Sequence, residues 1–370
     1  MAKKTVAKRV AQIVGIVVAV IVAVVLIYAL YLQLTYYRIA DNQELDVVSN
    51  QTAELTVDES YTAVTYNLGF GAYTPDYTFF MDEGVMADGT ETQGNRARAE
   101  SRESVEACTQ GDIEVVQNLD PDFILLQEVD TDSDRSYHVN QVQSFIDAFP
   151  GYASVFASNF HSAYLAYPLY EPHGSVNSGL LTLSDKQINS AVRRSYPVDE
   201  SFPTKFFDLD RCFEVMRIPV DNGRELVLIN SHMSAYDEGG TVRTQQLAML
   251  NDLLKQEADA GNYVICGGDW NHALSGSVDI YPSQQQVPDW VSVLNDGDLA
   301  EGYSVVPASN IADVPTCRGD DIPYEKGVTY TTTVDGFIVS SNVEAMAENI
   351  DTGFATSDHN PVQLSFRLRA

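Results

Sequence analysis

The fold is decided by the stretch from Tyr263 to Asn271, which reads YVICGGDWN. Its apolar start, up to Cys266, predicts a short buried strand, and the two glycines that follow allow the backbone to approach a ligand closely. Asp269 and Asn271 come directly after these glycines. A buried strand that ends in a carboxylate and an amide indicates a polar site at the edge of a sheet.

Similar apolar runs recur along the chain and predict further strands. They are Ala63 to Leu68, Phe123 to Leu126, Tyr152 to Ala157, Gly179 to Leu183, Phe213 to Val220, Leu226 to Asn230, Gly336 to Ser340 and Val362 to Leu368. Helical periodicity lies between some of them, at Arg96 to Leu119, Val139 to Phe149 and Val242 to Ala258. The polar turn Asp221-Asn222-Gly223 predicts an antiparallel hairpin. We therefore expect an α/β (α+β) domain with mixed, mainly antiparallel sheets and flanking helices.

Polar residues stand at the ends of these predicted strands. Asn67, Glu128, His232 and Asp269 follow their strands, whereas Asp335, Asp358 and His359 precede theirs. Because the end of one strand lies beside the start of its antiparallel neighbour, all of them are expected at one edge. Each alone has a plainer explanation as a turn former or a structural histidine. Together they predict one cleft.

The N-terminus carries a basic tail, with Lys3, Lys4, Lys8 and Arg9, before an uncharged apolar run from Ile13 to Leu32. A run of this length spans the ~30 Å hydrocarbon core of a bilayer, and the basic end is expected to stay cytoplasmic. A cleaved signal peptide is the alternative, but the run is long and bulky residues stand where small cleavage-site residues belong. We expect a cytoplasmic tail (1–10), a transmembrane helix (11–34), a linker or stalk (35–58) and an extracytoplasmic catalytic domain (59–370).

The chain is strongly acidic, with a formal net charge of −30. Its body contains no basic cluster, which disfavours nucleic acid as a partner. The cysteines, Cys108, Cys212, Cys266 and Cys317, lack zinc-site spacing. Their disulfide pairing stays open at this point.

The order of these motifs resembles the endonuclease/exonuclease/phosphatase superfamily, which includes DNase I-like nucleases, neutral sphingomyelinases and inositol polyphosphate 5-phosphatases. The resemblance extends from about Tyr61 to Leu368, and GGDWN and SDHNP are specific in combination. It implies a two-layer β-sandwich with helices outside and dependence on Mg²⁺, with Mn²⁺ as an alternative ion.

The resemblance also implies roles for individual residues. Glu128 is the main metal ligand, because hard oxygen ligands suit Mg²⁺, and Asn67 and Asp358 assist it. His359 and Asp335 form a dyad in which the carboxylate fixes the tautomer of the imidazole.

For the remaining positions, Asp269 orients or deprotonates the attacking water, although which of Asp269 and His359 activates this water is left open. Asn177, Asn271 and His232 would donate hydrogen bonds to the phosphate oxygens. Additional basic contacts, or else ordinary salt bridges, are expected from Arg135, Lys205 and Arg211.

The predicted function is therefore hydrolysis of a phosphodiester or phosphomonoester at a membrane surface. The substrate is either a lipid head group or a small phosphorylated compound. The alternatives are an extracellular nuclease, which the acidic charge disfavours, and a catalytically silent binding module, which would have lost one or more of these polar residues.

Overall fold

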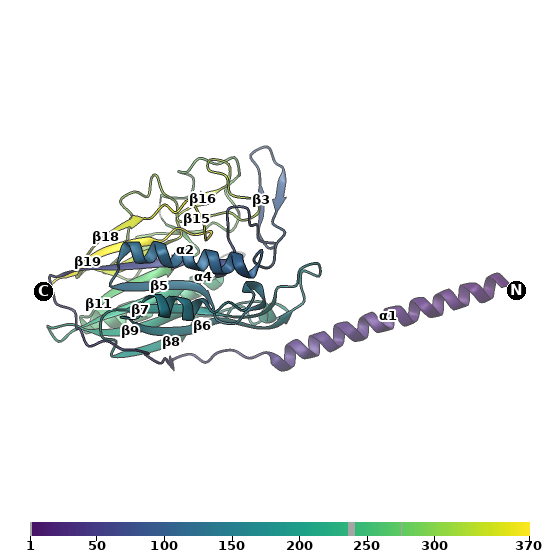
Figure 1. Ribbon diagram of the computed structural model, residues 1–370, viewed down its shortest axis with the longest axis horizontal. Helices are drawn as coiled ribbons and strands as arrows, with labels where there is room; N and C mark the ends of the chain where they lie inside the picture. Colours follow the sequence, from purple (N-terminus) through teal and green to yellow (C-terminus); the bar gives the residue numbers. More distant parts are fainter. Residues whose placement is uncertain (1, 236–240, 275) are drawn as a thin grey trace.

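Two β-sheets lie face to face in the computed structural model, which describes residues 2–235, 241–274 and 276–370 (Figure 1). The seven-stranded sheet contains, in spatial order, β1 (Gln43–Glu44), β8 (Ser190–Ser195), β9 (Cys212–Pro219), β10 (Glu225–His232), β11 (Tyr263–Asp269), β17 (Asp335–Ser340) and β14 (Tyr303–Val306). The six-stranded sheet contains β18 (Val343–Asn349), β19 (Val362–Leu368), β2 (Ser60–Asn67), β5 (Phe123–Asp130), β7 (Gly174–Ser184) and β6 (Ala153–Leu165).

The main hydrophobic core fills the space between the sheets. Phe123 and Leu125 from one sheet pack with Met216, Leu228 and Ile265 from the other, and all are fully buried. Only alternate residues of a strand point inward, so the other face of each sheet needs its own cover.

Three helices supply that cover. α2 (Arg102–Leu119) and α3 (Gln141–Ala148) pack on the six-stranded sheet, and α4 (Thr241–Ala260) packs on the seven-stranded sheet. α2 begins later than its periodicity predicts, because the side chain of Ser101 caps it by accepting a hydrogen bond from the Ser104 amide.

Most strand pairs in the two main sheets are antiparallel, but β2 pairs with β5, and β10 with β11, in parallel. The carboxyl ends of these strands therefore meet at one edge, where antiparallel β17 begins beside β11. This architecture confirms the predicted two-layer sandwich of mixed, mainly antiparallel sheets. Short two-stranded sheets complete the loops: β3 (Glu83–Val85) with β4 (Glu91–Gln93), β12 (Ala273–Leu274) with β13 (Val293–Leu294), and β15 (Cys317–Arg318) with β16 (Thr331–Thr332).

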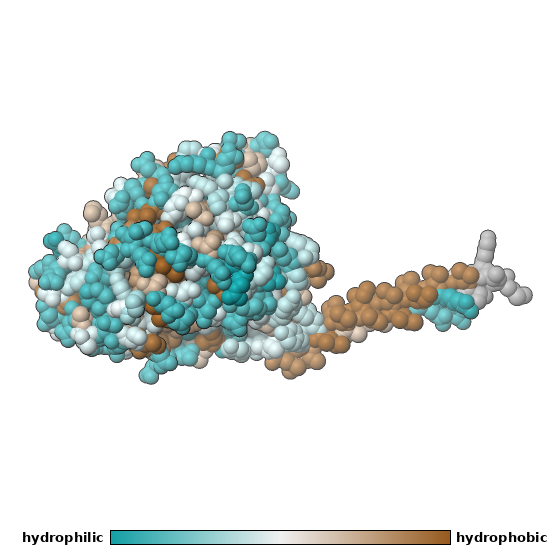
Figure 2. Space-filling view, in the orientation of Figure 1, coloured by the Kyte–Doolittle hydropathy of each residue, from teal (hydrophilic) through white to brown (hydrophobic). Residues whose placement is uncertain are grey.

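The N-terminal helix α1 (Ala2–Thr35) projects from the domain (Figure 1). Its segment from Val6 to Thr35 is long and apolar enough to cross a membrane. Figure 2 shows it as a hydrophobic rod beside a largely hydrophilic body.

The polar segment after α1 lies along the domain. β1 pairs with β8, Val48 bridges Ser154 of the opposite sheet, and Leu55 is fully buried and bridges Val220. The segment expected to form a linker or stalk is thus joined to both sheets.

Candidate active site

Asp269, at the end of β11, lies at the centre of the polar edge cluster, which we define as Asn67, Glu128, His232, Asp269, Asp335, Asp358 and His359. Its Oδ2 accepts a hydrogen bond of 3.0 Å from the Asn67 amide. The Nε2 atoms of His232 and His359 lie 3.4 and 3.8 Å from the same oxygen. Since Asn67 ends β2 and His232 ends β10, both sheets contribute to this one point.

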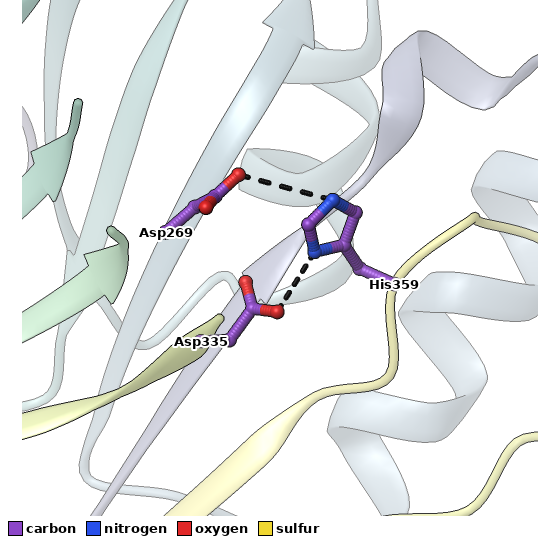
Figure 3. A group of neighbouring side chains, drawn as sticks. All are labelled: Asp269, Asp335 and His359. Carbon is purple, nitrogen blue, oxygen red and sulfur yellow. Dashed lines mark hydrogen bonds and ion pairs between the residues drawn. The ribbon is translucent and has the colours of Figure 1, made fainter. Parts of the chain in front are cut away.

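His359 and Asp335 form a hydrogen-bonded pair, with 2.8 Å between Nδ1 and Oδ2 (Figure 3). The backbone around the pair is fixed by hydroxyl groups: Ser357 Oγ accepts from the His359 amide, and Thr316 Oγ1 accepts from the Asp335 amide. Burial acts to lower the pKa of His359, but the adjacent carboxylates, Asp335 first, outweigh it and hold this pKa well above its usual range. The imidazole is therefore a cation at neutral pH, and its Nε2 faces Asp269.

Glu128 is presented by a β-bulge. The register of β5 against β7 shifts between Leu126 and Val129, and Glu128 itself has a φ of 53°. Its carboxylate reaches the Asn67 amide at 3.5 Å and the Arg135 guanidinium at 4.0 Å. Burial raises the pKa of Glu128, and Arg135 opposes that shift.

Burial also changes the protonation of the two central groups. It raises the pKa of Asp269 to about 6, with the His359 cation opposing and Asp335 adding to the shift. It lowers the pKa of His232 well below the usual range, with help from the positive charge of Arg211. At neutral pH the site therefore holds a weakly basic carboxylate beside a neutral and a charged imidazole.

The carboxylates of the polar edge cluster fit a metal ion. One ligand atom from each of Asp269, Asp335 and His359 lies within 4.8 Å of the others (Figure 3). Buried Asp335 Oδ1 has no hydrogen-bond partner among the described residues. His359, held as a cation and bonded to Asp335, has no free lone pair for a metal. The carboxylates of Glu128 and Asp358 lie close enough for the charge of Asp358 to raise the pKa of Glu128. A cation beside them would offset this buried negative charge, and carboxylates are the preferred ligands of Mg²⁺.

The proposed ligands Asn67 and Asp358 lie beside these groups. In this structure Asn67 Oδ1 accepts from the Gly69 amide, so its NH₂ group faces Glu128 and Asp269. Asp358 Oδ2 lies 3.9 Å from His359 Nε2. A neighbour that sequence reasoning missed is Asp320, which is buried, pairs with Arg318, and lies close enough to Asp358 for the charge of Asp358 to raise its pKa. The surrounding residues, RGDD, look like an ordinary turn, so no signal pointed to it.

The phosphate-binding candidates are placed differently from one another. The backbone N–H of Asn271 donates to Asp269 Oδ1 at 2.8 Å, which places Asn271 beside the cluster, while its side-chain amide donates to the Met233 carbonyl at 2.9 Å. Asn177 is exposed, and its side chain donates to the Asp132 carbonyl, so none of its described hydrogen bonds reaches the cluster.

The three basic residues predicted to contact phosphate lie in different places. Arg135 is buried and makes two hydrogen bonds to Asp130. Lys205 lies beside α1, where it donates to Gln33. Arg211 is buried close enough to Glu128 and His232 for its charge to lower the pKa of both groups.

The glycines of YVICGGDWN are needed for packing within the domain. A Cβ on Gly268 would lie 1.9 Å from the Ser231 carbonyl, and a Cβ on Gly267 would lie 2.5 Å from the Phe337 ring. Contacts within the sandwich therefore require both glycines, and the approach of a ligand to them stays a prediction.

The fold and the polar edge cluster together define a DNase I-like phosphoester hydrolase. Residues 64–359 match the Endonuclease/Exonuclease/phosphatase family, and because this match spans most of the sequence, the chain belongs to that family. No curated protein matches the chain.

Several solved structures share the fold. An endonuclease/exonuclease/phosphatase from Beutenbergia cavernae DSM 12333 is similar with a TM-score of 0.55 and 16% identity, over 84% of this chain and 72% of that one. TDP2 from D. rerio, complexed with a single-strand DNA product, has a TM-score of 0.51 and 16% identity, over 84% and 100%. ANGEL2, a 2',3'-cyclic phosphatase, has a TM-score of 0.52 and 13% identity, over 90% and 100%. Identities this low establish the fold alone.

Proposed function

We propose that this protein is a membrane-anchored, Mg²⁺-dependent phosphoesterase that acts outside the cytoplasmic membrane. Its substrate is a lipid head group or a small phosphorylated compound. The observation that carries the proposal is the continuous set of contacts, from Glu128 through Asn67 and Asp269 to His359 and Asp335, at one edge of a phosphoesterase fold. The apolar helix α1 supports a single-pass anchor with the N-terminus in the cytoplasm.

Glu128, assisted by Asp358 and by Asn67 after an amide flip, would hold the ion. When bound, Mg²⁺ supplies a Lewis acid for the phosphate oxygens. Dependence on the ion is tested by removing it with EDTA, which should abolish hydrolysis, and by adding Mg²⁺ or Mn²⁺, which should restore it.

We assign the proton transfer to Asp269 and charge stabilisation to His359. With a pKa of about 6, Asp269 is ionised at neutral pH and can accept a proton from the attacking water. His359, kept as a cation by Asp335, donates a hydrogen bond from Nε2 to a phosphate oxygen. Asn271 and neutral His232 would contribute further polar contacts to the phosphate, and Asn177 would act at the rim of the site.

Glu128→Gln tests the proposal in the full chain. We expect it to reduce Mg²⁺-dependent hydrolysis of bis-p-nitrophenyl phosphate and p-nitrophenyl phosphate by at least about a hundredfold, since it removes the main carboxylate for the ion. Glu348→Gln changes an exposed carboxylate of β18 and is the matched control.

Retention of activity by Glu128→Gln would contradict the metal assignment. The ratio of diester to monoester turnover separates the two reaction types, and single-stranded DNA tests the nuclease alternative. The net charge of −30 weighs against that alternative, because it repels the nucleic-acid backbone. Absence of hydrolysis of every substrate would favour a binding module.

A further inference from the structure

The last turns of α1 are attached to the end of β6 and the start of the loop that joins β6 to β7. The Tyr28 hydroxyl donates to the Tyr164 carbonyl at 3.1 Å and accepts from the Ala166 amide at 2.9 Å. The Tyr31 hydroxyl accepts from the Tyr164 amide at 3.1 Å. Leu32 is buried in a small cluster with residues of β6 and β7. These contacts place the loop between β6 and β7 beside the C-terminal end of α1.

Large apolar side chains are exposed on this loop and on the segment before β9. They form what we call the apolar rim: Tyr167 (65% exposed), Leu169 (85%), Tyr170 (70%), Phe202 (73%) and Phe207 (42%). The two segments meet at α1, because Phe206 packs in the same cluster as Leu32. Figure 2 shows hydrophobic surface at the margin of the domain beside the helix. Soluble surfaces rarely gather such side chains without a partner.

The position of the rim identifies that partner. If Ile13 to Leu32 spans the hydrocarbon layer, Tyr28 and Leu32 lie at its outer boundary, and the rim lies at the same level. Tyrosine and phenylalanine are suited to this boundary, because their rings are apolar and the tyrosine hydroxyl is polar.

The rim also lies at the catalytic edge. β7 begins at Gly174, just after the rim loop, and its first half pairs with the end of β5 that carries Glu128. Asp134 joins the two regions: its Oδ2 accepts from the Ser175 amide at 2.7 Å, and its neighbour Arg135 lies 4.0 Å from Glu128. In Figure 1 the helix leaves the molecule on the side opposite the C-terminus, which follows the far end of β19.

We propose that the apolar rim inserts into the head-group layer of the bilayer that α1 spans, so that the catalytic edge faces the bilayer and takes phosphate esters carried by lipids. The inference rests on the proposed function and narrows its substrate to lipid head groups. Acidic residues accompany Lys205 in the same segment, including Asp199, Glu200 and Asp208. Docking therefore depends on apolar burial rather than on basic charge, and it is insensitive to salt.

Depth-dependent quenching tests the docking in the full chain. The native cysteines are all buried, so Leu169→Cys can be labelled selectively with an environment-sensitive fluorophore. Met346→Cys on β18, which is 65% exposed, is the matched control. In phosphatidylcholine vesicles containing spin-labelled lipid, we expect at least about threefold stronger quenching at position 169 than at 346. Equal quenching at the two positions would overturn the proposal.

The substrate class is tested with the combined variant Tyr167→Ser, Tyr170→Ser, Phe202→Ser. Vesicles of phosphatidylcholine, sphingomyelin and phosphatidylinositol phosphates serve as the lipid probe, and release of water-soluble phosphate compounds is measured. We expect the variant to lose about tenfold or more of this release while hydrolysing bis-p-nitrophenyl phosphate normally.

The outcomes separate the two proposals. Normal lipid release by the variant, or no lipid release by a protein that cleaves bis-p-nitrophenyl phosphate, would overturn the inference alone. Failure to cleave either substrate would overturn the proposed function itself.

Discussion

Glu128 shows how a single residue can be placed by backbone conformation rather than by strand direction. A φ of 53° is unfavourable for a residue with a side chain, and such conformations concentrate at functional positions. The bulge that creates it turns the carboxylate toward Asn67. The alternation of a regular strand would not have predicted this orientation.

The Asp335–His359 pair leads to a prediction about pH. Asp335→Asn removes the carboxylate that contributes most to raising the pKa of His359, so this pKa should fall. If the His359 cation is required, activity is lost as pH rises through that pKa, and the alkaline limb of kcat/KM should move down by about one pH unit or more. We also expect kcat to fall by roughly a hundredfold or more. An unmoved alkaline limb, measured with bis-p-nitrophenyl phosphate, would argue against the cationic role.

Most of the residues at the site can be predicted from the sequence, but the partners that they contact cannot. The residue types after apolar runs identify Glu128, His232 and Asp269, because a buried strand delivers its end to an edge. The partners of Arg135 and the proximity of Asp320 to Asp358 depend on loops whose paths no local pattern determines. Asn177 was predicted from its position as a phosphate-binding residue, but its side chain donates to the Asp132 carbonyl, and the sequence gives no sign of this partner.

At the scale of elements, α2 is connected to the site through a buried acid. The Asp112 carboxyl of α2 accepts hydrogen bonds from Tyr66 of β2 and from Thr356, which lies two residues before Asp358. Burial raises the pKa of Asp112 to about 8. The helix, a central strand and the loop that carries His359 therefore share one protonated group.

This group should make stability depend on pH. Asp112 is protonated in the folded state up to about pH 8, whereas its ordinary pKa is 3.8, so unfolding between these values releases a proton. Its contribution to stability is complete below pH 4 and is lost as pH rises toward 8. Asp112→Asn should abolish the part of the pH dependence of the free energy of unfolding that this carboxyl causes, as measured by urea unfolding at several pH values. The loss of stability between pH 4 and pH 8 should then shrink by on the order of a few kcal/mol. The exposed Asp252→Asn should leave the slope unchanged, and an identical slope in both variants would refute the assignment.

The segment between α1 and β2 provides a second prediction for an element. Leu55 is fully buried in the main core, whereas Val48 in the same segment is 54% exposed. Leu55→Ala should lower the free energy of unfolding by about 2–5 kcal/mol, because it leaves a cavity. Val48→Ala is the control and should cost far less. Equal, small effects in denaturant titrations would mean that the segment does not stabilise the domain.

The elements were predictable where hydrophobic pattern dominates. The central strands β5, β10 and β11 are nearly continuous apolar runs, and the structure confirms them. β8 and β18 lie near sheet edges, carry polar residues and have no clear signal in the sequence. Parallel pairing of β10 with β11 was not predicted, because strand direction depends on the crossover through α4.

At the scale of the whole molecule, charge and hydrophobicity are separated. One apolar helix projects from an acidic, hydrophilic domain (Figure 2), and the sheet edge with the polar edge cluster lies on the side of the helix. This arrangement favours a site held at a surface over one that works free in solution.

The anchor itself can be tested by extraction. The full chain should remain in the membrane fraction after high-salt and alkaline washing, because an inserted apolar helix is not held by charge. Val18→Arg together with Val22→Arg should prevent stable insertion, since each arginine costs roughly 2.5–3.5 kcal/mol at the centre of a span. Release of the unmodified chain into the soluble fraction would indicate cleavage or peripheral attachment.

The attachment of the segment after α1 to both sheets bears on how the domain would be retained if α1 is its anchor. Proteases release surface enzymes by cutting exposed, unpaired stalks. Here β1 is paired with β8, Leu55 is buried, and Arg38 donates to the carbonyls of Asp208 and Leu209. If α1 anchors the enzyme, we expect these contacts to make the segment resist the cleavage that would release the domain from the membrane.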